Sequence, residues 1–313
     1  MISKNLCFKL MREDLKRRIW TIALTILSFV FTLLVPVAIK CSSFTENMER
    51  ATEDFYKLNL INNLRNMVEV NGLVITILLV LAVVWAVSGF RYLHNSKQVD
   101  FYHSIPVKRH QLFLASYLNG ILVLGIVYFV IQVLSAGLIL NTGLGGQTLG
   151  SVWWKIFLLN MVYYSMIYTT TVIAMMMTGN IVVSLLGTGV FFGYGPAVIV
   201  LIEGYRQMWF LTLFETSAQE AEWIRKICYS SPFTKYMFSL EDFSSKPFAP
   251  KIIGAIAVTV VLAIIAYSLY KVRPSEAAGK AMAFKKTETP IKILITIPVA
   301  VVFGMFFYSL RST

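Results

Sequence analysis

The chain has 313 residues, of which 57% are hydrophobic and only 14% charged, and it carries a net charge of +12 at pH 7. Soluble domains are about 45–50% apolar and about 25% charged, so this composition excludes most soluble folds and also intrinsic disorder. A mean hydropathy of +0.68 predicts an integral membrane protein whose basic residues lie in cytoplasmic loops, and nothing in the sequence indicates a nucleic-acid partner.

The first element in chain order is a basic N-terminal segment, residues 1–18. Its apolar side chains recur at helical spacing and its basic side chains fall on other faces: Ile2, Leu6, Leu10 and Met11 against Lys9, Arg12 and Lys16. This pattern predicts an amphipathic helix along the inner membrane surface, and both lipid anchoring and protein docking are compatible with it. The apolar run that follows is long and lacks a small-x-small cleavage site, so we expect an uncleaved first span.

Seven uncharged runs are long enough, at 1.5 Å per residue, to cross a hydrocarbon core about 30 Å thick. They are residues 19–39, 71–90, 112–140, 156–177, 181–202, 252–270 and 293–310. Together they place about half of the chain in the membrane. The sequence therefore predicts an all-α integral membrane protein with seven spans.

Only Thr178-Gly179-Asn180 separates the fourth run from the fifth, so the pair is either one continuous buried helix or a tight helical hairpin. The distribution of charge favours the hairpin. With the N-terminus inside, the cytoplasmic segments carry 16 Lys/Arg and five Asp/Glu, a net charge of +11, whereas the outer segments sum to +1. That asymmetry is what the positive-inside rule expects, and a merged helix would put the basic segment 271–292 outside.

The seven runs contain no Asp, Glu, Lys, Arg or His. Ion-coupled transporters need such groups at membrane depth, so a channel or secondary carrier is disfavoured. Polar residues in the runs are better explained by hydrogen bonds between helices than by a substrate path: Gln132, Asn160, Tyr163, Tyr164 and Tyr168. The single G-x-x-x-G match, Gly189 to Gly193, could allow close helix contact and is more typical of internal packing than of a subunit interface.

Motifs for catalysis, cofactors or metals are missing from the sequence. Nothing matches the phosphate-binding G-x-x-x-x-G-K-[ST] pattern, so we expect a non-catalytic chain without a nucleotide or other cofactor. The three histidines, His94, His103 and His110, show no H-E-x-x-H pairing. Cys7, Cys41 and Cys228 show no CxxC spacing; a disulfide between the last two is possible on the predicted outer side, but two unrelated thiols are favoured.

A predicted cytoplasmic turn at residues 98–110 contains a compact aromatic group. The residues of interest are Asp100, Phe101, Tyr102, Ile105, Pro106, Lys108 and Arg109. The aspartate can cap a helical turn that presents the two aromatic residues and the isoleucine as an apolar knob, and Ser104 and the proline can start the next helix. The knob suits insertion into a groove on a soluble partner, with the two basic residues facing the cytoplasm. The alternative is that the aromatic rings anchor the turn among lipid headgroups.

Three stretches resemble a bacterial group of ABC-2-type transporter permeases: Asp100-Phe-Tyr-His-Ser-Ile-Pro-Val-Lys-Arg109, Phe8-Lys-Leu-Met-Arg-Glu-Asp-Leu-Lys-Arg-Arg18 and Pro274-Ser-Glu-Ala-Ala-Gly-Lys-Ala-Met-Ala-Phe284. The similarity runs through the whole chain. It implies a connecting helix at residues 1–18 and a six-helix transmembrane module over residues 19–271. Within that module it implies a coupling helix at 98–110 and an outer helical region at 203–250, followed by a cytoplasmic linker at 272–292 and a seventh span at 293–310.

By this resemblance the chain is the membrane subunit of an ATP-driven exporter or antimicrobial-resistance transporter in the bacterial cell membrane, with its N-terminus in the cytoplasm. The coupling helix would dock on a separate ATP-binding subunit, which hydrolyses the ATP, and a second permease subunit would complete the transporter. The basic module has six spans and longer relatives continue beyond a seventh, so a truncated member of a longer group is one interpretation. The alternative function is a non-transporting membrane scaffold or sensor that recruits a soluble partner.

Overall fold

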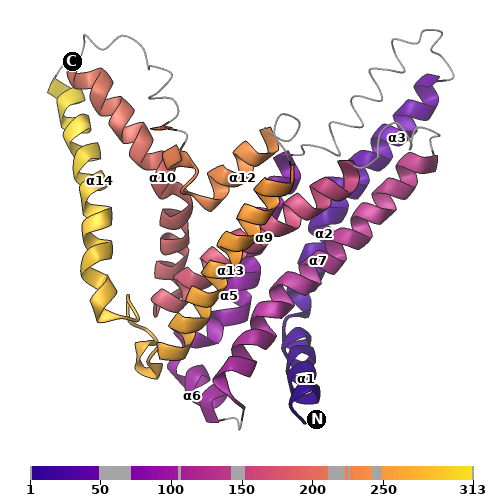
Figure 1. Cartoon of the computed structure of the whole chain (residues 1–313), viewed down its shortest axis with the longest axis horizontal. Coiled ribbons are helices and arrows are strands. Elements are labelled where there is room, and N and C mark those ends of the chain that lie inside the picture. The colour runs from indigo at the N-terminus through magenta and orange to yellow at the C-terminus, as the bar shows by residue number, and fades with distance from the viewer. Residues whose placement is uncertain are drawn as a thin grey trace. The chain divides into compact units, whose positions relative to one another are not determined.

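The structure is a computed structural model, and it describes residues 2–48, 72–104, 107–141, 152–210, 223–224, 226–241 and 248–311. Within these ranges the regular structure is helical (Figure 1), and an isolated antiparallel bridge joins Thr178 to Met282. Seven of the described helical segments are long and apolar enough to cross a membrane. The predicted all-α, multi-pass membrane class is therefore confirmed.

The helical elements in chain order are α1 (Ile2–Arg17), α2 (Ile19–Phe29), a π-helical turn (Val30–Leu34), α3 (Val35–Met48), α5 (Gly72–Phe90), the 3-10 turn η2 (Arg91–His94), α6 (Ser96–Ser104), α7 (Arg109–Asn141), α9 (Val152–Met177), α10 (Ile181–Trp209), α12 (Pro232–Glu241), α13 (Phe248–Val272), the 3-10 turn η3 (Ser275–Ala277) and α14 (Lys285–Arg311). Each predicted span coincides with one helix or one continuous helical run. The differences lie at the ends, where helices continue past the apolar runs into polar and charged residues.

A turn between α9 and α10 divides the fourth and fifth runs into two helices, so the alternative of one continuous helix is wrong. Asn180 caps α10, because its side-chain Oδ1 accepts a hydrogen bond from the amide of Val182 at 2.9 Å. The turn is held by the segment that follows α13: the amide of Gly279 donates to the carbonyl of Gly179 at 2.8 Å. Gly179 has no room for a side chain, since a Cβ there would collide with the carbonyl oxygen of Ala277.

The chain divides into two compact units. The first comprises Met1–Arg91, His103–Val172 and Pro247–Tyr267, and the second comprises Tyr92–Tyr102, Ile173–Lys246 and Ser268–Thr313. In the first unit the long helix α7 is the central element, with α1, α2, α3 and α5 all packed against it (Figure 1). In the second unit, α10 packs against both α12 and α14.

Polar side chains join α7 to α9 within the first unit. Asn160 donates its Nδ2 to the hydroxyl of Tyr128 at 2.7 Å, and the hydroxyl of Tyr164 donates to the carbonyl of Gly120 at 2.8 Å. The hydroxyl of Tyr168 donates to the carbonyl of Ser116, in α7, at 3.4 Å. These contacts confirm that Asn160, Tyr164 and Tyr168 hold helices together, as the sequence predicted.

The G-x-x-x-G match in α10, Gly189 to Gly193, was predicted to allow close contact with another helix. A Cβ placed on Gly189 or on Gly193 would meet no atom within 4 Å. Within the described part of the second unit, the two glycines therefore make no close helix contact of the kind predicted for internal packing. Close approach to α10 occurs instead at Gly195, where a Cβ would lie 2.8 Å from Ser230 Oγ.

Candidate partner-docking site around helix α6

The short helix α6 begins at Ser96 and has Asn95 as its N-cap. Asn95 Oδ1 accepts a hydrogen bond from the amide of Lys97 at 3.1 Å, and its carbonyl accepts one from the amide of Val99 at 2.9 Å. Asp100 is therefore an exposed residue inside the helix, and its predicted capping role is wrong. Asparagine and aspartate are comparable caps, so residue type alone did not distinguish the two positions.

The predicted start of the next helix is also displaced. Ser104 is the last residue of α6, and α7 begins at Arg109. The carbonyl of Lys108 accepts the amide of Gln111 at 2.9 Å and so closes the first turn of α7. Lys108 and Arg109 are both exposed. Ile105 and Pro106 lie outside the described residues.

Phe101 is the large apolar side chain that α6 leaves exposed. Its exposed fraction is 55%, whereas the neighbouring Tyr102 is half-buried. The two rings meet edge to face with centroids 5.8 Å apart. Val99, on the opposite side of α6, is buried and fixes the helix to the rest of its unit. The arrangement presents one aromatic ring outward from an anchored helix.

A chain of three tyrosines connects α6 to the last turn of α13. The ring of Tyr102 lies over that of Tyr92, in η2, with centroids 4.4 Å apart. The hydroxyl of Tyr92 forms a hydrogen bond with the hydroxyl of Tyr270 at 2.9 Å. Both of these tyrosines are buried, so α6 is tied to the ends of two predicted spans through contacts that exclude water.

Arg273 forms the polar centre of this region. It is buried, with a 5% exposed fraction, and its Nη1 donates to the carbonyls of Met175 at 2.6 Å and Met176 at 2.8 Å. Its Nη2 donates to the carbonyl of Leu93 at 3.0 Å. The last carbonyls of a helix have no helical donor and carry partial negative charge, so a planar guanidinium satisfies the end of α9 well.

The guanidinium of Arg273 keeps its charge in this setting. Burial lowers the pKa of Arg273 to about 10. The nearby Tyr92 and Tyr270 have the opposite, smaller effect and raise the pKa. A pKa near 10 still leaves the group protonated at neutral pH. One buried cation therefore joins η2, the C-terminus of α9 and the segment after α13.

His94 links the same region to the start of α10. Its Nε2 lies 3.0 Å from the hydroxyl of Ser184, and that hydroxyl also forms a hydrogen bond with Thr178. No sequence pattern indicates a role for Ser184, Tyr92 or Tyr270, and the sequence marks Arg273 only as one of the inner positive charges. The available signal is that Arg273 lies three residues after the predicted sixth span.

No protein-family model, curated protein or solved structure matches the chain. Among the described residues, no group of His, Cys, Asp and Glu is arranged to hold a metal ion. The site consists of an exposed aromatic residue on a short helix. Buried contacts connect that helix to the ends of several predicted spans, so a movement of the helix can be transmitted to them.

Proposed function

We propose that this chain is the membrane-spanning subunit of an ATP-driven ABC-2-type transporter, of the exporter or antimicrobial-resistance kind. In this proposal α6 is the coupling helix, and a separate ATP-binding subunit docks on it from the cytoplasm. The observation that carries the proposal is the pairing of exposed Phe101 with Tyr102, whose ring is connected through Tyr92 to Tyr270 at the end of a span.

The partner would act on this chain through differential binding. A bound partner shifts a two-state equilibrium only by the difference in its affinity for the two states. ATP would favour one arrangement of the paired ATPase subunits, and that arrangement would hold α6 in one position. Because Arg273 joins Leu93 to Met175 and Met176, displacement of α6 would be passed to the ends of the spans rather than lost in a loose loop.

ATP hydrolysis and passage through the membrane belong to different chains in this proposal. ATP binding and hydrolysis occur on the partner, and this chain contributes the passage through the membrane together with a second permease subunit. Its location is the bacterial cell membrane, with the N-terminus in the cytoplasm. The three stretches that resemble ABC-2-type permeases support this assignment, and one of them contains α6 residues 100–104.

The first test is purification of the full chain from its own membranes, with mass spectrometry of the co-purifying proteins in the presence and absence of a non-hydrolysable ATP analogue. We expect a stoichiometric ATP-binding subunit. Recovery of a kinase, or of no partner, would favour the scaffold alternative over the transporter.

A variant pair tests the role of α6 in the same experiment. Phe101→Asp places a charge where the apolar contact is proposed, and the ATPase should then no longer co-purify. Gln98→Asp places the same charge on a polar, exposed position of the same helix and should leave co-purification unchanged. Normal recovery of the ATPase with Phe101→Asp would contradict the assignment of α6 as the coupling helix.

A further inference from the structure

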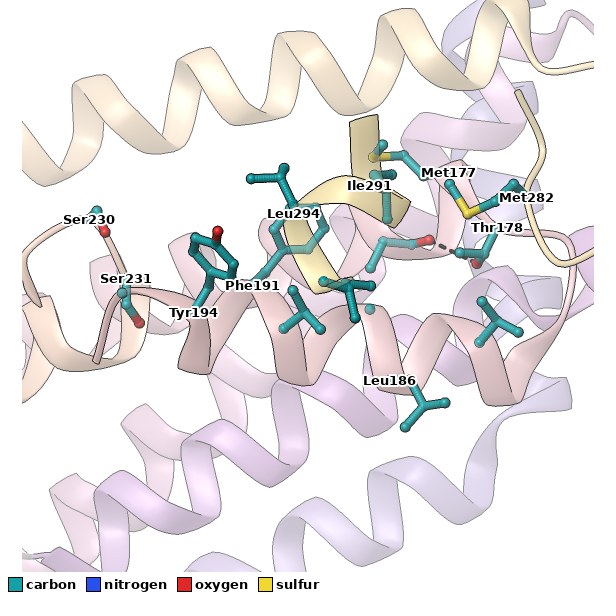
Figure 2. Close-up of a pocket in the computed structure, with 16 residues that line it drawn as sticks. Met177, Thr178, Leu186, Phe191, Tyr194, Ser230, Ser231, Met282, Ile291 and Leu294 are labelled. Atoms are coloured by element: carbon teal, nitrogen blue, oxygen red, sulfur yellow. Dashed lines mark hydrogen bonds between the residues drawn. The ribbon is translucent and has the colours of Figure 1, made fainter. Parts of the chain in front are cut away.

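An elongated apolar cavity of about 410 Å³ lies in the second unit between α10 and α14 (Figure 2). Its walls are aliphatic and aromatic side chains from the two helices, among them Leu186, Val190 and Phe191 of α10 and Ile291 and Leu294 of α14. Met177, Thr178 and Met282 lie at one end, and Tyr194, Ser230 and Ser231 lie at the other (Figure 2). Its volume is within the range of sites that hold small ligands.

The cavity matches the length and surroundings of a lipid chain. Its lining on α10 runs from Val183 to Gly195, which is about 18 Å at 1.5 Å per residue. One leaflet of the hydrocarbon core is about 15 Å deep. Leu186 is 66% exposed and Leu294 is 49% exposed, so the walls continue into exposed apolar surface on two helices long and apolar enough to cross a membrane. An extended acyl chain can therefore enter sideways from the bilayer.

Three basic residues lie within four residues of Met282 in the chain, and Met282 lies at one end of the cavity. Lys280, Lys285 and Lys286 are all exposed, and α14 begins at Lys285. The nearby carboxylate of Glu288 is occupied by Lys292, whose Nζ lies 2.6 Å away. This is the predicted cytoplasmic side, where the membrane leaflet is rich in anionic lipids that basic residues attract. The charge at this end therefore complements a phosphate headgroup.

We propose that the cavity between α10 and α14 binds one acyl chain of an anionic phospholipid, with the headgroup near Lys280, Lys285 and Lys286. The lipid is a bound component taken from the bilayer. This site goes beyond the transporter function proposed above, because occupancy requires neither ATP nor an ATPase partner.

Photolabelling of the full chain tests the site. The protein is placed in phosphatidylcholine nanodiscs containing a small fraction of phosphatidylglycerol with a diazirine near the end of its acyl chain. After irradiation, peptides are mapped by mass spectrometry. Labelling should concentrate on the α10 peptide around Val190 and the α14 peptide around Leu294. Label spread evenly over lipid-facing helices would overturn the proposal.

Two glycines of α10 give a matched pair of variants. Gly187 lines the cavity, and the nearest atom to a Cβ placed there is Ala174 Cβ at 4.0 Å, so Gly187→Leu should fill the cavity and remove most of the label. Gly189 is not among the lining residues and has open space around it, so Gly189→Leu should be labelled like the natural chain. Equal labelling of the two variants would contradict the site.

Competition with unlabelled lipids tests the headgroup and does not depend on how Gly187→Leu folds. Phosphatidylglycerol should displace the label better than phosphatidylcholine by about fivefold or more in the natural chain, given about 1 kcal/mol for each basic residue near an anionic surface. Replacing Lys280, Lys285 and Lys286 with Gln should abolish that preference. Equal competition by the two lipids in the natural chain would overturn the proposed anionic selectivity.

Discussion

Ser231 donates its hydroxyl to the carbonyl of Phe192, in the middle of α10. The reason this carbonyl is available lies four residues further along, at Pro196, which has no amide hydrogen to donate back to it. A carbonyl without a partner is costly inside a membrane. The segment before α12 therefore completes the hydrogen bonding of a span, which also explains why Gly195 must lack a side chain where this segment approaches.

A double-mutant cycle tests this relationship. Ser231→Ala should lower the free energy of unfolding by about 0.6 kcal/mol, and by no more than about 1.7 kcal/mol, the range measured for hydrogen bonds within membrane proteins. In a Pro196→Ala background the restored amide supplies the donor, so the same substitution should cost much less. Ser239→Ala is the control, because the hydroxyl of Ser239 donates to the carbonyl of Lys235 within the same helix, α12, at 2.8 Å. Equal costs of Ser231→Ala in both backgrounds would refute the proline explanation.

Arg273→Lys should lower the free energy of unfolding of the region around α6, although position 273 keeps a positive charge. A lysine ammonium cannot span the carbonyls of Leu93 and the two methionines, so at least one charge-assisted hydrogen bond is lost, at a cost of about 1.5–3 kcal/mol. Unfolding in detergent measures the change. Arg91→Lys makes the same substitution at an exposed position and should stay within about 0.5 kcal/mol.

The pH dependence of the free energy of unfolding that Arg273 contributes is a second observable. The pKa of Arg273 is lowered in the folded state, to about 10, so above that pH the unfolded chain holds the proton more tightly. Stability contributed by this group therefore rises with pH through about 10, and stays constant from about pH 6 to 9. Arg273→Met removes the titrating group, so its stability difference from the natural chain should be constant from about pH 6 to 9, and a change in that window would contradict a guanidinium that stays charged at neutral pH.

The spans and the hairpin could be predicted because they depend on quantities that sequence contains directly. Length and apolarity identify a span, and the count of basic residues on each side separated a hairpin from one long helix. The boundaries of α6 could not be predicted as well. Asn95 and Asp100 are both suitable caps, and only the hydrogen bonds of Lys97 and Val99 show which of them begins the helix.

The buried arginines show why the candidate site was only partly predictable. Arg18 and Arg273 look like ordinary inner-side charges, yet both are buried. Arg18 pairs with Asp14 and lies over the ring of Trp85 at 5.8 Å, while Arg273 binds backbone carbonyls. Backbone acceptors carry no residue-specific signal, and a ring so distant in the chain as that of Trp85 becomes a neighbour only through helix packing.

Gly120 should be intolerant of any side chain. A Cβ at this position would lie 2.5 Å from Cζ of Tyr168, so Gly120→Ala must separate α7 from α9 and should cost about 1–3 kcal/mol. Gly137, on the same helix, has no atom within 4 Å of the corresponding position, and Gly137→Ala should stabilise by about 0.5–1 kcal/mol through helix propensity. Thermal unfolding of the two variants compares them directly. A neutral Gly120→Ala would show that the two helices are not so closely packed.

Tyr270→Phe should separate docking from transmission. The substitution removes the hydroxyl that bonds to Tyr92 at 2.9 Å and leaves Phe101 untouched. We expect the ATPase to co-purify normally, with a reduced stimulation of its turnover by the membrane subunit. Tyr267→Phe is the control one turn earlier in α13, because the ring of Tyr267 contacts Phe113 and its hydroxyl makes none of the described hydrogen bonds. Loss of co-purification with Tyr270→Phe would assign the tyrosine chain to binding instead.

Cysteine labelling tests the predicted topology. Cys228 is a half-buried thiol without a disulfide in the described part of its unit. A chain that retains Cys228 after Cys7→Ser and Cys41→Ser should react with a membrane-impermeant maleimide in intact cells, since residue 228 lies in a predicted outer segment. Burial raises the pKa of the Cys228 thiol above its ordinary value, so less thiolate is present at neutral pH and the reaction is slow. The rate should increase about tenfold per pH unit below that pKa, because the thiolate is the reacting form. Label that appears only after permeabilisation would invert the predicted orientation of the chain, and would place α6 on the outer side, away from any source of ATP.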